Sequence, residues 1–136
     1  MADYKILEHK ADLKIQVWGK TKEELFQNAL TGMVKSAQYG FISDSPLLRK
    51  EIKISSFDIT SLLVDFLTEI LFLCETEKIV YYKIKFKNLT DQKLEGILIG
   101  QKLKQVGVQI KAVTYHDLII NQDKNGLWQA IILFDI

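Results

Sequence analysis

The chain has 136 residues, of which 48% are hydrophobic, so it is long enough to bury one substantial core. Eighteen Lys and Arg residues stand against seventeen Asp and Glu residues, which leaves a net charge of +1. This balance gives no signal for a general duplex-binding surface or a polybasic membrane anchor. We therefore expect a single domain over residues 1–136.

The single cysteine and the apolar segments predict the compartment. Cys74 has no partner for an internal disulfide, and its position in the apolar run ILFLC favours a packed small hydrophobe over a nucleophile. The first ten residues mix charges and lack a signal-peptide pattern. The most apolar stretch, 62–74, is interrupted by polar residues and is too short to cross a bilayer of about 30 Å. We expect a cytoplasmic protein without membrane association.

The start of the chain predicts two short strands. Residues 4–8 form the first candidate, and in 13–18 the apolar residues Leu13, Ile15 and Val17 alternate with polar ones. A period of two is typical of a strand with one wet face. The two strands either form a hairpin or lie in different sheets.

A helix is predicted to follow. Thr21 and Glu24 have the spacing of a capping box, which marks a helix start, and Gly40 is the expected end. Residues 26, 30, 33 and 37 are apolar and share one helix face. The polar residues of this helix are expected to face solvent; they are Lys22, Glu23, Gln27 and Lys35.

The middle of the chain predicts a loop, a second helix and further strands. Residues 41–50 contain the only proline and predict a loop, and 52–54 predict a brief strand. A helix is expected from residue 57 or 58 to 74, with apolar residues on more than one face, which indicates a central position.

In the next predicted strand, 82–86, apolar residues alternate with Lys83, Lys85 and Lys87. These lysines invite comparison with a phosphate-binding strip. A solvated strand face is the favoured interpretation, because no aromatic platform is interleaved on the same face.

The last third of the chain predicts three strands, at 94–99, 108–120 and 127–134, with an Asn-Gly turn before the last. Strands gathered after helices favour an α+β domain over an alternating parallel fold. We therefore expect two helices packed on a largely antiparallel or mixed β-sheet.

The common catalytic and cofactor motifs are missing from the sequence. The segment 96–100 has two glycines but lies in an apolar strand and lacks the Lys-Ser or Lys-Thr of a phosphate loop. One cysteine and two histidines cannot form a usual thiolate zinc site, and no serine has a Gly-x-Ser-x-Gly context.

Acidic groups at two strand ends remain as candidate ligands. Asp12 starts the second predicted strand, whereas Asp135 and the α-carboxylate of Ile136 end the last one. If the last strand runs beside the first pair, these groups form an all-oxygen site, which hard cations such as Ca²⁺ or Mg²⁺ prefer. The alternative is an Asp that bonds nearby backbone amides and a solvated chain end. His9 fits either a supporting contact to such a site or a turn.

Five segments together resemble the archease family in order, spacing and position: LEHKADLKI, GKTKEELFQNAL, DITSLLVDFLTEILFL, KAVTYHDL and the terminal WQAIILFDI. The resemblance covers essentially the whole chain. It implies an archease-like fold and an activator of the RNA-splicing ligase in tRNA splicing. Such an activator is a chaperone-like protein cofactor that promotes ligase guanylylation and multiple turnover but does not itself catalyse ligation.

The resemblance also implies site residues and partners. Asp12, Asp135 and Ile136 fall on the family's metal-binding positions, and the implied cofactor is a divalent ion, Ca²⁺ first, with Mg²⁺ or Mn²⁺ as alternatives. Lys111 falls on a position used in activation of the partner, with His9 as a supporting residue. The implied partner is the ligase, with tRNA reached indirectly through it, and a homo-oligomer is left open.

The sequence departs from the family pattern in two places. The family usually reads Asp-His-Thr-Ala-Asp followed by a small residue, whereas this chain has Lys10 within the motif and Lys14 after it. An ammonium near the acidic residues weakens or replaces a bound cation. Before KAVTYH the family usually begins with Gly-Glu, whereas this chain has Gly100-Gln101.

Two other functions are compatible with the same residues. One is a small metal-dependent hydrolase or nucleotide-binding enzyme that uses Asp12 and Asp135 with His9 as base, and it predicts turnover without a partner. The other is a general holdase, which requires a contiguous exposed apolar patch. The burial periodicity of the apolar residues disfavours the holdase.

Overall fold

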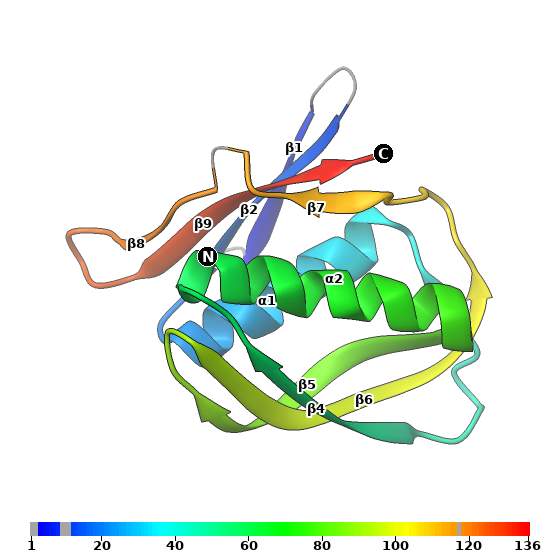
Figure 1. Cartoon of the computed structure of the whole chain (residues 1–136). Helices are drawn as coiled ribbons and strands as arrows, with labels where there is room; N and C mark the ends of the chain where they lie inside the picture. The colour runs from blue at the N-terminus through cyan, green and yellow to red at the C-terminus, as the bar shows by residue number, and fades with distance from the viewer. Residues whose placement is uncertain (1–2, 9–11, 117) are drawn as a thin grey trace.

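The computed structural model describes residues 3–8, 12–116 and 118–136 and arranges them in three layers (Figure 1). Two antiparallel sheets form the outer layers, and two helices lie between them. The predicted α+β class with two helices on antiparallel sheet is thus confirmed, with the strands divided between two sheets.

The first sheet carries both ends of the chain. Its order is β1-β2-β9-β7, and β8 also pairs with β9. The strands are β1 (Tyr4–Glu8), β2 (Asp12–Gly19), β7 (Ala112–Thr114), β8 (Ile120–Gln122) and β9 (Trp128–Asp135). β1 and β2 form an antiparallel hairpin, and the last strand runs antiparallel beside β2. The sequence left open whether the first two strands form a hairpin. It also made the acidic site depend on the last strand running beside the first pair, as it does here.

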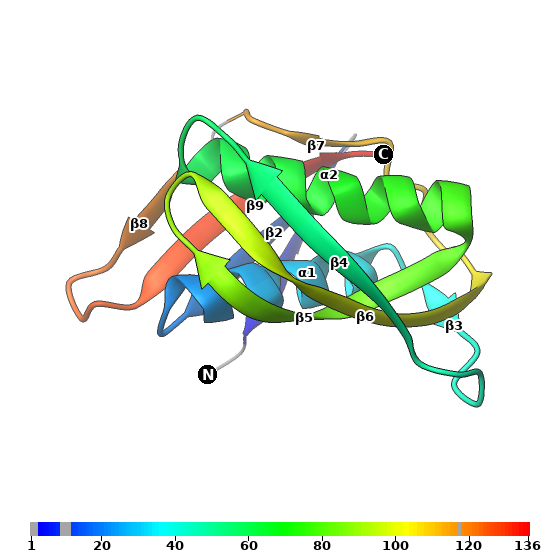
Figure 2. The same cartoon turned by 60° about the horizontal axis from the view of Figure 1, so that its bottom comes forward.

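The second sheet has the order β3-β6-β4, and β5 pairs with β6. Its outer surface comes forward in Figure 2. The strands are β3 (Gly40–Phe41), β4 (Leu48–Ser55), β5 (Ile79–Leu89) and β6 (Lys93–Gln105). Three predicted strands are therefore longer than expected. The predicted loop 41–50 starts with the last residue of β3 and ends with the first three residues of β4. β6 extends the most, because its first part pairs on both sides, with β4 and β5, and its end pairs with β3.

The helices follow their predicted start signals more closely than their predicted ends. α1 (Lys22–Ser36) is capped by the Thr21 hydroxyl, which accepts a hydrogen bond from the Glu24 amide at 3.1 Å. The prediction that Gly40 ends this helix is wrong. Gln38 instead adopts the left-handed conformation, with φ 54°, and the chain leaves the helix two residues earlier.

α2 (Ile59–Glu77) begins as predicted, with Asp58 as its N-cap. It runs beyond residue 74, because Lys78 provides the left-handed cap at φ 59°. Ring centroids of Phe26 on α1 and Phe66 on α2 are 5.9 Å apart, so the two helices share the central core. In the described part of the chain, no helix has the length and hydropathy needed to span a membrane.

The predicted strand over 108–120 is wrong. Among its described residues, only Ala112–Thr114 (β7) and Ile120, the first residue of β8, lie in strands, and the residues before β7 are irregular. The Gly107 and Val108 amides donate to the Ala37 carbonyl at 3.1 and 2.9 Å. The end of α1 thus holds the backbone of this segment away from a strand ladder.

The position of α1 between the two sheets also contradicts part of the prediction that its polar residues face solvent. Gln27 was expected in solvent but is half-buried, because the helix contacts β2 on one side and β5 on the other. Lys22 is likewise half-buried, and its ammonium pairs with Asp91 and lies 5.3 Å from the centre of the Trp128 ring.

Candidate functional site

Strands β2 and β9 place Asp12 directly opposite Asp135. Directly opposed residues of an antiparallel pair point to the same face, with Cβ atoms about 4.5–5.5 Å apart. This face is the outer one, because the neighbouring pair, Leu13 and Phe134, packs into the core. Two carboxylates separated by most of the sequence therefore share one outer corner of the first sheet.

The chain end and Lys111 adjoin this corner. Ile136 follows Asp135 directly and is 39% exposed. On the other side of β9, the Lys111 amide donates to the Asp135 carbonyl at 2.7 Å, and Ala112 pairs with Asp135. We call Asp12, Asp135 and the α-carboxylate of Ile136 the acidic tip. β2, β9 and β7 thus bring together four of the five residues that the sequence singled out.

His9 lies outside the described residues, and so does Lys10. The role of His9 therefore stays a prediction. Within the described ranges, no three side chains of His, Cys, Asp or Glu gather as a metal site, so the donors here are two aspartates and the chain end. These donors are all oxygen atoms, the set that Ca²⁺ and Mg²⁺ prefer, and the residues present fit such an ion with further ligands from water or a partner.

Lys14 shares the outer face with Asp12, two residues further along β2. It pairs with Leu133 and is therefore diagonal to Asp135. Diagonal neighbours in a sheet remain within reach of long side chains. The extra ammonium noted in the sequence thus lies in the first sheet next to the acidic tip, and its side chain is half-buried.

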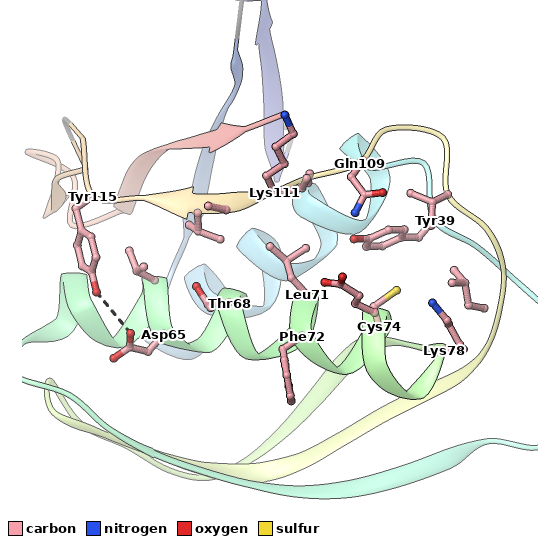
Figure 3. Close-up of a pocket in the computed structure, with 17 residues that line it drawn as sticks. Tyr39, Asp65, Thr68, Leu71, Phe72, Cys74, Lys78, Gln109, Lys111 and Tyr115 are labelled. Carbon is pink, nitrogen blue, oxygen red and sulfur yellow. Dashed lines mark hydrogen bonds between the residues drawn. The ribbon is translucent and has the colours of Figure 1, made fainter.

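A groove of about 520 Å³ runs along α2, and Lys111 borders its middle part (Figure 3). One wall is α2, and the other is the chain between the end of β6 and β7. In the close-up, Lys111 points away from α2, so its ammonium lies outside the floor of the groove. Its exposed side chain is therefore free to reach a partner on the side of the acidic tip.

The ends of the groove carry different polar groups. At one end the Tyr115 hydroxyl lies 3.5 Å from Asp65 Oδ1, and desolvation together with this carboxylate raises the pKa of Tyr115. At the other end, burial raises the pKa of both Tyr39 and Cys74. Cys74 is only 3% exposed, which confirms its role as a packed side chain. A buried thiol with a raised pKa is a poor nucleophile at neutral pH.

Sequence reasoning missed this groove. Asp65 is one of the polar residues that interrupt the apolar stretch 62–74, and Tyr115 lies 50 positions away in the sequence. No local motif links these positions, because the groove forms where an irregular segment packs beside α2. Lys111 was found through the resemblance alone.

Comparison with known proteins agrees with this architecture over the full length. Residues 4–136 match the family described as "Archease protein family (MTH1598/TM1083)". The chain is 35% identical to "Protein archease" of Methanosarcina barkeri, over 98% of this chain and 95% of that protein. It is 31% identical to "Protein archease" of Methanothermobacter thermautotrophicus, over the whole of both chains.

Solved structures show the same fold. The solution structure of Methanobacterium thermoautotrophicum protein 1598 has a TM-score of 0.75 and 27% identity, and all of both chains is covered. The crystal structure of an archease, described as a possible chaperone, from Thermotoga maritima has a TM-score of 0.70 and 22% identity, covering 97% of this chain and 96% of that one. This chain belongs to the archease family.

Proposed function

We propose that this protein is an activator of the RNA-splicing ligase in tRNA splicing. It acts as a chaperone-like protein cofactor in the cytoplasm that promotes ligase guanylylation and multiple turnover, and it has no catalytic activity of its own. The observation that carries the proposal is the pairing of Asp12 with Asp135 beside the chain end and Lys111. In a member of the archease family, this pairing joins the positions that the resemblance assigns to metal binding and activation.

The acidic tip would hold one divalent cation, Ca²⁺ in the first instance, with Mg²⁺ or Mn²⁺ as alternatives. When bound, such an ion supplies positive charge that polarises phosphoryl oxygens and orients them. Asp12, Asp135 and the Ile136 carboxylate would offer oxygen ligands from the paired ends of β2 and β9. The protein's contribution is therefore to present charge at a fixed geometry.

Lys111 adds a positive charge next to this acidic corner. Its amide is fixed by Asp135, while its ammonium is exposed and points away from α2 (Figure 3). A flexible ammonium is a common phosphate-binding group. In the proposal, Lys111 contacts phosphate oxygens in the ligase's nucleotide site while the acidic tip lies at the ligase's metal site.

The test is multiple-turnover ligation by the partner ligase, with guanylylation of the ligase measured in parallel. Asp12→Asn and Asp135→Asn keep side-chain size but remove the charge, and we expect each to abolish most of the stimulation. Asp44→Asn, at an exposed loop position, is the matched control and keeps full stimulation. Unchanged stimulation by a folded Asp12→Asn, Asp135→Asn double variant would refute the role of the acidic tip.

The same experiment separates the activator from an enzyme. A small metal-dependent hydrolase or nucleotide-binding enzyme at Asp12 and Asp135 predicts hydrolysis of GTP or a phosphodiester by the protein alone. We expect no turnover without the ligase. If the protein alone shows metal-dependent hydrolysis that is lost in the Asp135→Asn variant, the activator proposal is refuted and the enzyme alternative is supported.

A further inference from the structure

The outer face of the second sheet carries an excess of positive charge. On its three long strands, the basic side chains on this face are Arg49, Lys53, Lys83, Lys85, Lys87 and Lys93, and the acidic ones are Glu51 and Glu95. This face therefore has a net charge of +4, although the whole chain has +1. The remainder of the molecule is net acidic, so the charges are segregated rather than mixed.

Five of these six cations form two rows on the strands that flank β6, and Lys93 lies on β6 itself. Arg49 on β4 and Lys83 on β5 both pair with Ile99, and Glu51 and Lys85 both pair with Ile97. Neighbouring strands are about 4.7–4.9 Å apart, so the two rows are roughly 10 Å apart at the backbone. The middle row between them is apolar where it meets Lys83 and Lys85.

Most of these cations have no acidic partner among the residues that the structure describes. Lys53 pairs with Glu95 at 3.7 Å, and the Lys53 side chain is 76% exposed. Lys83, Lys85 and Lys87 are exposed and form no ion pair with a residue in the described ranges. Three adjacent unpaired ammonium groups on one strand repel one another, and a polyanion relieves that repulsion.

We propose that this face, which we call the basic face, binds the phosphate backbone of double-helical RNA. Single-stranded nucleic acid requires aromatic side chains that are available for base stacking. The aromatic residue beside the lysine row, Tyr82 at a bulge of β5, is already stacked on Phe41, with ring centroids 4.7 Å apart, and donates its hydroxyl to Gln101. A-form RNA instead presents two phosphate rows across a deep, narrow major groove, and proteins recognise it by shape and backbone contacts. The two rows, with Ile97 and Ile99 between them and Glu51 between Arg49 and Lys53 on β4, have a spacing that matches this arrangement.

The position of the basic face allows RNA and the acidic tip to be engaged at the same time. The tip belongs to the first sheet and the basic face to the second, on opposite sides of the helix layer (Figures 1 and 2). Bound RNA would therefore not cover Asp12 or Asp135. The inference rests on the proposed function for its choice of RNA over DNA.

The test measures direct binding of the full chain, without ligase, to a fluorescent RNA duplex of at least about 16 base pairs, a length that a compact double-stranded-RNA module spans. We expect salt-dependent binding. The variant with K83Q, K85Q and K87Q should bind at least tenfold more weakly, with a salt dependence reduced by about one unit per lost phosphate contact. R49Q with K53Q removes the other row and should also weaken binding.

The matched control carries K20Q, K35Q and K124Q, which remove the same charge at exposed positions off this face, and it should bind within twofold of the parent protein. The inference is overturned if the parent does not bind the duplex at low salt or if the control weakens binding equally. It is also overturned if single-stranded RNA, polyglutamate or phosphatidylserine vesicles are preferred to the duplex.

Variants of the acidic tip test the RNA-binding inference separately from the proposed function. D12N with D135N should bind RNA normally while failing to stimulate the ligase. RNA binding by a parent protein that gives no ligase stimulation would refute the proposed function and leave the basic face intact. Ligase stimulation without RNA binding would refute only the basic face.

Discussion

Gln27 on α1 completes the backbone hydrogen bonding of β5 through Ile84. The Ile84 amide donates to Gln27 Oε1 at 2.9 Å, and Gln27 Nε2 donates to the Tyr82 carbonyl at 3.1 Å. β5 pairs with β6 on one side only, so this edge would otherwise leave two main-chain groups facing the helix layer. The Gln27 side chain thus joins α1 to the second sheet.

Gln27→Leu should therefore destabilise the protein by about 1–3 kcal/mol, the usual cost of stranding partly buried polar groups. Urea unfolding monitored by circular dichroism measures the change. Glu23→Gln on the exposed face of the same helix is the control and should lie within about 0.5 kcal/mol of the parent. Equal midpoints for parent and Gln27→Leu would contradict the structural role of Gln27.

Gln101 ties the loop between β3 and β4 to β6. It is 6% exposed, and its Nε2 donates to the carbonyls of Ser43 and Ser45 at 3.0 and 2.8 Å. Its Oε1 accepts from the Tyr82 hydroxyl at 2.7 Å. Glu, which the resemblance described above leads us to expect at this position, lacks the two amide donors.

Gln101→Glu should loosen that loop, because a carboxylate cannot donate to the two serine carbonyls. We expect faster amide exchange over residues 42–47 and a loss of about 1–2 kcal/mol in stability. Hydrogen exchange by mass spectrometry reads out the loop directly. Gln105→Glu, on the exposed end of the same strand, should leave the exchange of the loop unchanged; similar acceleration in both variants would exclude a specific tie.

The sequence predicted elements whose signals are local and missed features that depend on the layers. Thr21 and Asp58 mark helix starts through their own side chains, and both helices begin there. Gln27 follows a pattern typical of a solvent face, but the second sheet covers it. The same limit applies to Asp12 and Asp135, whose meeting depended on an assumed strand order that no local signal contains.

The predicted strand at 108–120 failed for a related reason. Its apolar residues fit a strand, but the Gly107 and Val108 amides bind the Ala37 carbonyl at the end of α1. Backbone groups used in this way cannot join a ladder, and the resulting irregular segment forms one wall of the groove. The local pattern was correct about burial but not about conformation.

Tyr39 should make the protein less stable at alkaline pH. Burial raises its pKa above the ordinary value of 10.0, so the folded state holds the phenol proton more tightly than the unfolded state. Its stabilising contribution is fully present below pH 10 and is lost as pH rises through the folded pKa. Burial also raises the pKa of Cys74 above its ordinary value of 9.0. Its contribution to stability is therefore also lost as pH rises, starting at a lower pH than for Tyr39.

Tyr39→Phe should therefore flatten the loss of stability between pH 9 and 11 relative to the parent, because one of the titrating groups is gone. Urea midpoints at a series of pH values measure this slope, with each protein referred to its own value at pH 7. Parallel curves for parent and variant would contradict a tightly held proton at Tyr39.

Lys14 should weaken cation binding at the acidic tip. It lies on the same outer face of β2 as Asp12 and is diagonal to Asp135, so its ammonium repels a bound cation and competes for the same carboxylates. Lys14→Gln should raise the affinity for Ca²⁺ about two- to fivefold, as expected for an interaction of about 0.4–1 kcal/mol. Isothermal titration calorimetry at low ionic strength measures the change.

Lys5→Gln is the control for this prediction. It removes the same charge from β1, opposite Gln16 and further from the tip, and should change the affinity for Ca²⁺ little. An equal gain in Ca²⁺ affinity in both variants would show that the effect comes from net charge and not from the position of Lys14. Weaker Ca²⁺ binding by Lys14→Gln would show that Lys14 favours cation binding at the acidic tip, contrary to the prediction.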